Sequence, residues 1–92
     1  MNLIINSEKT ALLHKSAEQS LKSLHVFLLF AEHMDEKNQY SETSFNIAEK
    51  LDCSNTTAEK AIRVLAKNGI ITIGKSGGRN IYTVSPEIVR KE

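Results

Sequence analysis

The sequence has no tryptophan, one proline and one cysteine, and its longest near-apolar stretch covers only residues 26–31. A single cysteine, Cys53, excludes an internal disulfide and a four-thiolate zinc site within one chain. A membrane-spanning helix needs roughly 20 apolar residues, and no basic segment followed by an apolar one opens the chain, so we expect a cytoplasmic protein. A length of 92 residues leaves room for one core, and we expect a single domain over residues 1–92.

Residues that could hold a metal or perform catalysis are also scarce. His14, His25 and His33 form no pair at zinc-ligand spacing and have no cysteine or carboxylate cluster beside them. Cys53 is interpreted as a small, buried and unreactive thiol. The sequence therefore predicts no enzyme, no metal and no cofactor.

One segment imitates a phosphate-binding loop. Residues 69–76 fit the pattern of a glycine, four residues, then Gly-Lys-Ser. A true phosphate loop follows a strand and opens a helix, whereas this segment follows a helical pattern and contains the strand-like run Ile-Ile-Thr-Ile. We therefore predict no nucleotide binding.

Charge is distributed unevenly along the chain, although the net charge is only +1. Residues 1–59 hold five lysines and nine carboxylates, a net charge of −4. Residues 60–92 hold seven lysines and arginines and two glutamates, a net charge of +5. This gradient predicts a basic face suited to a polyanion.

The first part of the chain predicts an arm and one long helix. Residues 1–15 are an N-terminal arm in which Leu3–Ile5 can add an edge strand to a sheet. The polar segment 35–39 should end the helix in a surface loop outside the core. The helix should run from Ser16 to Met34 on a buried stripe of Ala17, Leu21, Leu24, Leu28 and Ala31, widened by Phe27 and Met34.

Residues 41–68 predict two further helices joined by a short turn. The second helix should begin at a cap among Ser41–Thr43, end near Leu51, and face inward at Phe45, Ala48 and Leu51.

The third helix should be capped by Ser54 or Asn55 and run to Asn68, where Gly69 supplies a left-handed exit. Its inner face should carry Ala58, Ala61, Ile62 and Leu65.

Residues 70–85 predict a β-hairpin, because Ile71, Ile73 and Val84 belong to alternating strand patterns on either side of a glycine turn. Pro86 should end the second strand, and the last six residues are interpreted as a short basic tail.

These elements together predict an α+β, mostly α fold: a winged helix-turn-helix of three helices plus a C-terminal β-hairpin wing. A helix of this kind fits a DNA major groove about 12 Å wide, while the wing reaches the backbone or the minor groove. We expect Asn55 to pair with adenine, Thr56 and Thr57 to reach a phosphate or a thymine methyl, and Arg63 to bind guanine or phosphate. The full set of predicted DNA-binding residues is Ser54, Asn55, Thr56, Thr57, Glu59, Lys60, Arg63 and Lys67 on the helix and Lys75, Ser76, Arg79 and Asn80 at the wing tip.

Four segments carry a resemblance to known proteins: Val26-Phe27-Leu28 leading to Asp35-Glu36-Lys37-Asn38, Ile47–Leu51, Ser54–Leu65 and Tyr82–Val89. Through them the sequence from Leu24 onward resembles plasmid replication proteins of the RepL type and, more loosely, plasmid-borne winged-helix regulators. Asp52 stands where such turns often have glycine, although aspartate tolerates the left-handed conformation better than most residues. The resemblance implies binding of an origin or operator in plasmid DNA replication, copy control or partition.

We therefore expect a sequence-specific double-stranded DNA-binding protein that acts in replication or transcription regulation. A homodimer is expected, because one recognition helix contacts few base pairs and paired half-sites raise specificity. The N-terminal region and the first helix, with Leu12-Leu13 and Leu3–Ile5, are the expected dimer surface. The alternative is a winged helix that binds another protein and not DNA.

Overall fold

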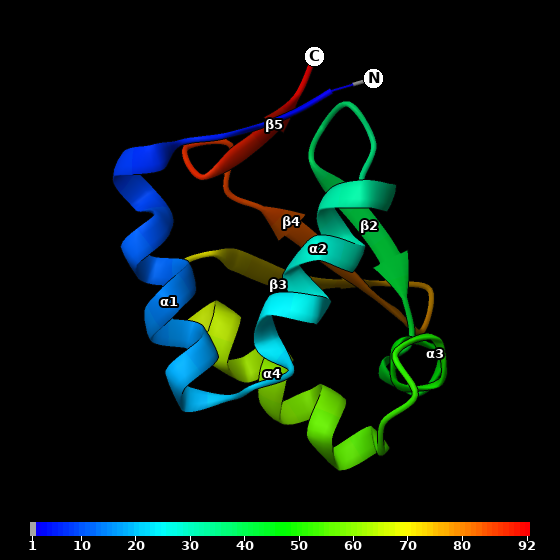
Figure 1. Ribbon diagram of the computed structural model, residues 1–92. Coiled ribbons are helices and arrows are strands. Elements are labelled where there is room, and N and C mark those ends of the chain that lie inside the picture. Colours follow the sequence, from blue (N-terminus) through cyan, green and yellow to red (C-terminus); the bar gives the residue numbers. More distant parts are fainter. Residues whose placement is uncertain (1) are drawn as a thin grey trace.

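The computed structural model describes residues 2–92 and contains four α-helices and five strands in two small sheets. The α+β class is thereby confirmed, with one helix more than the sequence predicts. A 3-10 turn at Ser7–Lys9 precedes the first helix. The elements in chain order are β1 (Leu3–Ile5), α1 (Thr10–Gln19), α2 (Ser23–His33), β2 (Gln39–Glu42), α3 (Ser44–Lys50), α4 (Asn55–Lys67), β3 (Ile71–Ser76), β4 (Arg79–Val84) and β5 (Val89–Lys91) (Figure 1).

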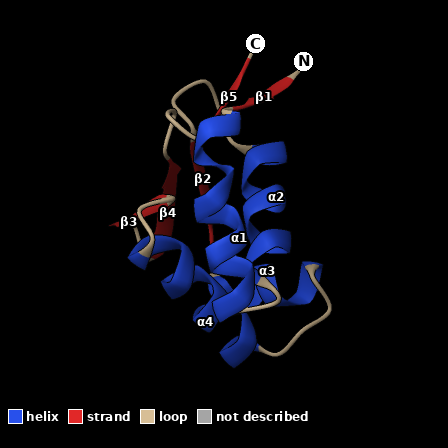
Figure 2. Cartoon of the chain, turned by 60° about the vertical axis from the view of Figure 1, so that its left-hand side comes forward, coloured by secondary structure: helices blue, strands red, loops and turns tan. Residues whose placement is uncertain are grey.

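The larger sheet has the antiparallel order β2-β4-β3 and lies against one side of the helices (Figure 2). The predicted hairpin of β3 and β4 is confirmed, with Ser76 opposite Arg79 at its end. Gly77 and Gly78 have φ angles of 58° and 82°. Two consecutive positive φ angles are the requirement of the tight hairpin turn whose twist matches that of the strands, so the glycine pair is needed there.

The smaller sheet joins the two ends of the chain. Strand β1 is the predicted edge strand, and it pairs with β5 so that Ile5 lies opposite Val89. The prediction of a basic C-terminal tail is wrong: Pro86 follows the end of β4 as expected, but Ile88 and Val89 are buried. Strand β5 could not be predicted from its local sequence, because it has only three residues. Its pairing partner, β1, lies at the other end of the chain.

The predicted helix from Ser16 to Met34 is two helices, α1 and α2, separated at residues 20–22. Ser20 adopts an extended conformation, and its carbonyl accepts hydrogen bonds from the Ser23 amide (3.0 Å) and the Ser23 hydroxyl (2.8 Å). Serine hydroxyls offer the backbone an alternative to helical bonds, which explains the break.

The break changes which side of α2 faces the core. Leu21 is 89% exposed, and Leu24 and Leu28 also lie on the surface, so the predicted buried stripe is wrong at these three positions. The buried face consists instead of Ser23, Val26, Phe27, Phe30 and Ala31.

Aromatic packing joins α2 to the larger sheet. Phe30 and Tyr82 are fully buried, and their rings stack with centroids 4.7 Å apart. Tyr40 of β2, which is paired with Tyr82 across the sheet, also packs against Phe30, at a centroid distance of 5.5 Å. Burying two large rings at this contact removes several hundred Å² of apolar surface from water, which makes it the centre of the core.

The segment 35–42 contains a strand and a buried asparagine that the sequence did not reveal. Asn38 has a φ angle of 60° and is only 7% exposed, so the prediction that residues 35–39 lie outside the core is wrong at this position. Its Nδ2 donates hydrogen bonds to the carbonyl oxygens of Val84 (3.1 Å) and Val89 (2.9 Å). The Asn38 side chain therefore ties β2 to both β4 and β5.

Replacing Asn38 with alanine should lower the free energy of unfolding by about 2–4 kcal/mol, because two buried carbonyls lose a donor and alanine is strained at positive φ. Asn38→Gly removes the same hydrogen bonds without the strain, so its loss should be smaller by about 1–2 kcal/mol. Urea denaturation measures both changes. Equal losses in the two variants would show that the backbone conformation at this position costs nothing.

No helix in residues 2–92 is both long enough and apolar enough to cross a membrane.

Candidate nucleic-acid interface

Helices α3 and α4 are joined by a short connector, as predicted for residues 41–68, except that residues 41 and 42 belong to strand β2. The Thr43 hydroxyl caps α3 by accepting a hydrogen bond from the Asn46 amide at 3.1 Å. In the connector, Asp52 has a φ angle of 52°, the left-handed conformation that allows the chain to turn. Ala48 and Ala58 are buried, which lets the two helices approach closely.

Of the three inward positions predicted for α3, Ala48 is buried and Leu51 is partly buried, but Phe45 is 67% exposed, so that part of the prediction is wrong. Ile47 is buried instead. Cys53 is partly buried against the core, in the connector.

Helix α4 begins and ends where the sequence predicts. The Ser54 hydroxyl accepts a hydrogen bond from the Thr57 amide at 3.1 Å, which satisfies one of the free donors of the first turn. At the other end, Gly69 has a φ angle of 75°. The predicted inner residues Ala58, Ala61, Ile62 and Leu65 are all buried.

The outer face of α4 is basic. Lys60, Arg63 and Lys67, which we call the cation stripe, are exposed and follow one another at spacings of three and four residues. This spacing places them on one side of the helix, in line with Thr56 and opposite the buried face. None of the ion pairs in residues 2–92 includes a member of the cation stripe. Their charges are therefore available to a ligand.

A shallow groove runs between the cation stripe and strand β3. Its floor is formed by Val64 and Ala66 of α4 and by Ile73, which is 45% exposed, while the cation stripe lines its edge. Sequence reasoning treated Ile73 only as a strand residue. Ile73 could have been identified from its place in the strand that directly follows α4. In the structure its apolar side chain lies near the three cations of the cation stripe.

Several predicted residues at the start of α4 are bonded to one another. Asn55 Nδ2 donates a 2.6 Å hydrogen bond to Glu59 Oε1, and the Ser54 and Thr57 hydroxyls lie 2.9 Å apart. These hydrogen bonds lie within the first two turns of α4. Thr56 has no side-chain hydrogen bond in the described part of the chain and remains free to contact a ligand.

The hairpin tip also divides into free and engaged residues. Lys75 and Ser76 are exposed and take part in no side-chain hydrogen bond or ion pair described for residues 2–92. Arg79, in contrast, forms an ion pair with Glu42 at 3.7 Å, and Asn80 Nδ2 donates to the Tyr82 hydroxyl at 2.9 Å.

Glu42 is a charged residue near this face that the predicted site does not include. Its carboxylate accepts hydrogen bonds from Asn46 Nδ2 (2.9 Å) and the Thr43 amide (3.0 Å) and lies 3.7 Å from both Arg79 and Lys50. These bonds, with the one from Asn46 strongest, hold the pKa of Glu42 below its ordinary value of 4.5. The ion pair between Glu42 and Arg79 depends on the pairing of β2 with β4, which local sequence does not predict.

The segment that imitates a phosphate loop forms strand β3, which leads through the glycine turn into β4 and not into a helix. No group of three or more histidine, cysteine or carboxylate side chains in residues 2–92 is arranged to hold a metal ion.

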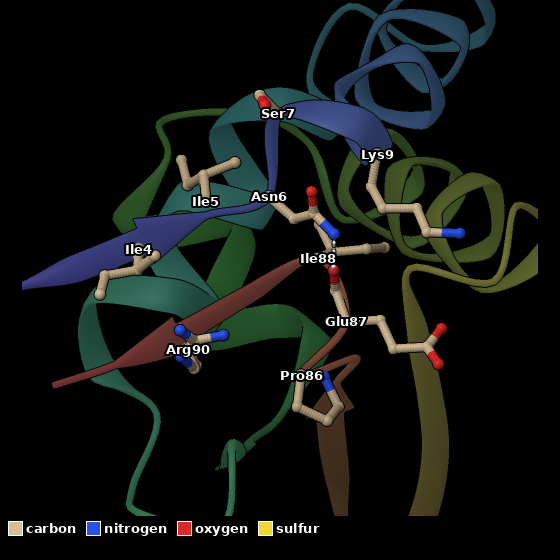
Figure 3. Close-up of a pocket in the computed structure, with 9 residues that line it drawn as sticks. All are labelled: Ile4, Ile5, Asn6, Ser7, Lys9, Pro86, Glu87, Ile88 and Arg90. Atoms are coloured by element: carbon tan, nitrogen blue, oxygen red, sulfur yellow. Dashed lines mark hydrogen bonds between the residues drawn. The ribbon is translucent and has the colours of Figure 1, made fainter.

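A second hollow lies at the far end of the molecule, where β1 and β5 meet (Figure 3). Asn6 Nδ2 donates to the Glu87 carbonyl oxygen at 3.1 Å, and the Asn6 amide donates to the Ile88 carbonyl oxygen at 2.8 Å. The polar groups of this hollow thus hydrogen-bond the N-terminal segment to the C-terminal segment.

No protein-family model and no curated protein matches this sequence. Among solved structures, the chain is similar to the ST1889 protein from the thermoacidophilic archaeon Sulfolobus tokodaii, with a TM-score of 0.62 and 20% sequence identity. The similarity covers 85% of this chain and 73% of the archaeal protein. At this level of identity it shows a shared fold and nothing about activity.

Proposed function

We propose that this protein is a winged helix-turn-helix protein that binds double-stranded DNA through α4 and the hairpin tip. The observation that carries the proposal is the cation stripe: three exposed cations on the outer face of α4 that form no ion pair in residues 2–92. The order α2, β2, α3, α4 and then the β3–β4 hairpin matches that of winged helices and supports the same reading.

In the proposed complex, α4 lies in the major groove, where its first turns reach base edges. Thr56 and Arg63 are the side chains proposed to contact bases, and Lys60 and Lys67 bind phosphates on either side of the groove. Lys75 and Ser76 at the hairpin tip contact the neighbouring backbone. The activity is binding without a chemical step.

The proposed target is an origin or operator, because the sequence resembles plasmid replication proteins of the RepL type and plasmid regulators. The protein would then act in plasmid replication, copy control, partition or transcription regulation. Such a role places it in the cytoplasm, where plasmid DNA lies.

We also propose a homodimer, with the interface on α2, which is the second part of the expected first helix. Leu13 is buried and Leu12 partly buried in the core of their own chain, so neither is free to pair with a partner. Leu24 and Leu28 are exposed on the outer face of α2, and Leu21 is exposed in the break before it.

The charges on α2 suit a second copy of the same helix. Lys22 precedes its first turn, and Glu32 lies in its last turn. Two antiparallel copies related by a twofold axis bring the lysine of each near the glutamate of the other, around a leucine centre. Sedimentation should show a dimer that becomes a monomer on Leu28→Lys. A wild-type monomer at high concentration would contradict this interface.

The test of the proposed function is a fluorescence-anisotropy titration with random duplex DNA at two salt concentrations, followed by the DNA upstream of the gene. The proposal predicts affinity that falls steeply with salt and is higher for the upstream duplex. Absence of binding at low salt would contradict it and favour the alternative, a winged helix whose apolar-floored groove binds an acidic segment of another protein.

The Arg63→Ala variant should show whether Arg63 contacts a base or a phosphate. If Arg63 contacts a base, the variant should lose about 1–3 kcal/mol of binding to the specific duplex and much less on random DNA. An equal loss on both duplexes would assign Arg63 to a phosphate. Val64→Ala, which removes methyl groups and no charge from the adjacent groove floor, is the control for disturbance of the helix surface.

A further inference from the structure

Cations near the proposed DNA surface are of two kinds. Lys60, Arg63 and Lys67 form no ion pair in the described part of the chain. Arg79 and Lys50 each lie 3.7 Å from a carboxylate oxygen of Glu42. The two kinds should respond differently to DNA, because Arg79 and Lys50 must separate from the Glu42 carboxylate before they can bind a phosphate.

The Glu42 carboxylate is held in place independently of Arg79. The hydrogen bonds from the Asn46 side chain and the Thr43 amide fix it at the start of α3, and its side chain is only 12% exposed. Both donors are neutral, and neither depends on the hairpin. The carboxylate therefore stays charged and in position when Arg79 moves.

Arg79 is held much more loosely. A separation of 3.7 Å is too long for a hydrogen bond, and the Arg79 side chain is 55% exposed. The residue directly follows the glycine turn of the hairpin. Because the guanidinium is exposed and makes no hydrogen bond to Glu42, it can change partners at low cost.

We propose that Glu42 is an internal anion that Arg79 exchanges for a phosphate when DNA binds. This inference rests on the proposed function and concerns the same surface. Glu42 thereby acts as a positioning residue: it keeps the arginine of the hairpin tip on the β2 side until a phosphate replaces it.

The exchange changes the number of cations released to solution when DNA binds. When Arg79 binds a phosphate, that phosphate releases a condensed cation, but the vacated Glu42 carboxylate attracts a cation from solution. Lys50 remains beside Glu42 and reduces this uptake without removing it. The Arg79 contact therefore adds little to the salt dependence, whereas each phosphate contact made by Lys60 or Lys67 steepens the dependence of log K on log salt by about 0.9.

The experiment compares the wild type, Glu42→Gln, Arg79→Gln and the double variant by anisotropy titration with random duplex DNA over a salt series. Glutamine keeps an oxygen that accepts from Asn46 and Thr43, so the local fold is retained. Glu42→Gln should bind more tightly at low salt, with a slope steeper by about 0.5–0.9. Between about 50 mM and 200 mM salt its advantage should shrink about two- to fourfold.

The other variants isolate the exchange. Arg79→Gln and the double variant should both keep the wild-type slope, although they bind more weakly than Glu42→Gln. Glu49→Gln is the matched control, because it removes an exposed α3 carboxylate that forms no ion pair in residues 2–92, and it should leave the slope unchanged. Lys60→Gln should flatten the slope by about 0.9.

Each other outcome overturns the inference. An unchanged or flatter slope in Glu42→Gln, or a steepening of equal size in Glu49→Gln, would overturn the exchange while leaving DNA binding in place. A flatter slope in Arg79→Gln would do so without relying on the Glu42 variant. If the wild type does not bind duplex DNA at low salt, the proposed function fails and the exchange fails with it.

Discussion

Replacing Phe30 with alanine should lower the free energy of unfolding by about 3–5 kcal/mol. Phe30 is fully buried against the stacked ring of Tyr82 and the tilted ring of Tyr40, so the substitution removes the contact that joins α2 to the larger sheet. A cavity among rigid aromatic rings collapses poorly, which places the expected loss toward the upper end. Chemical denaturation followed by circular dichroism measures it.

Phe45→Ala is the matched control, because it removes the same side chain from a position that is 67% exposed. Its effect on stability should stay within about 0.5 kcal/mol. Comparable losses in the two variants would mean that Phe45 is buried in solution, by a second copy or by a different arrangement of α3.

Replacing Lys60, Arg63 and Lys67 together with glutamine should weaken binding to random duplex DNA about a hundredfold at low salt, because Lys60 and Lys67 lose their phosphate contacts and Arg63 contributes little without its specific base. Each charge-assisted contact to phosphate contributes about 1.5 kcal/mol, or roughly tenfold in affinity. The slope of log K against log salt should flatten by about 1.8, since each of the two lost phosphate contacts accounts for about 0.9. Folding should be unaffected, because the three side chains are exposed and unpaired in the described part of the chain.

The control for this variant removes the same net charge elsewhere. Lys9, Lys15 and Lys37 are exposed residues that lie outside α3, α4 and the hairpin. Their triple replacement with glutamine should reduce affinity only slightly, through the change in net charge. If both triple variants lost affinity equally, binding would depend on total charge and the cation stripe would have no special role.

Helix α4 and the hairpin were predictable because each carries its own signals. The Ser54 cap, the spacing of Ala58, Ala61 and Leu65, and the exit at Gly69 agree with one another over the whole length of α4. The glycine pair of the hairpin requires positive φ angles that few other residues adopt. These elements contain most of the proposed site, which is why its residues could be named from sequence.

The orientation of α2 was not predictable from its periodicity. Between Leu24 and Ala31 every residue except His25 is apolar, so several stripes fit the helical spacing equally well. Which stripe is buried depends on the sheet that covers it, and in particular on the stacking of Tyr82 against Phe30.

Strands β2 and β5 were missed for a related reason. Gln39–Glu42 has no alternation of apolar residues, and its strand exists because β4 supplies the hydrogen bonds. The Glu42 ion pairs follow from that pairing, since Glu42 lies opposite Asn80, next to Arg79. Interactions that depend on long-range register could not be derived from local sequence.

The most direct test of DNA binding through α4 is a titration of the isotope-labelled protein with a short duplex, followed by backbone amide chemical shifts. If DNA binds through α4, the largest changes should occur at Thr56–Lys67 and in the hairpin tip, with small changes in α1 and the β1–β5 sheet. Changes concentrated around β1 and β5, with α4 unaffected, would contradict the account.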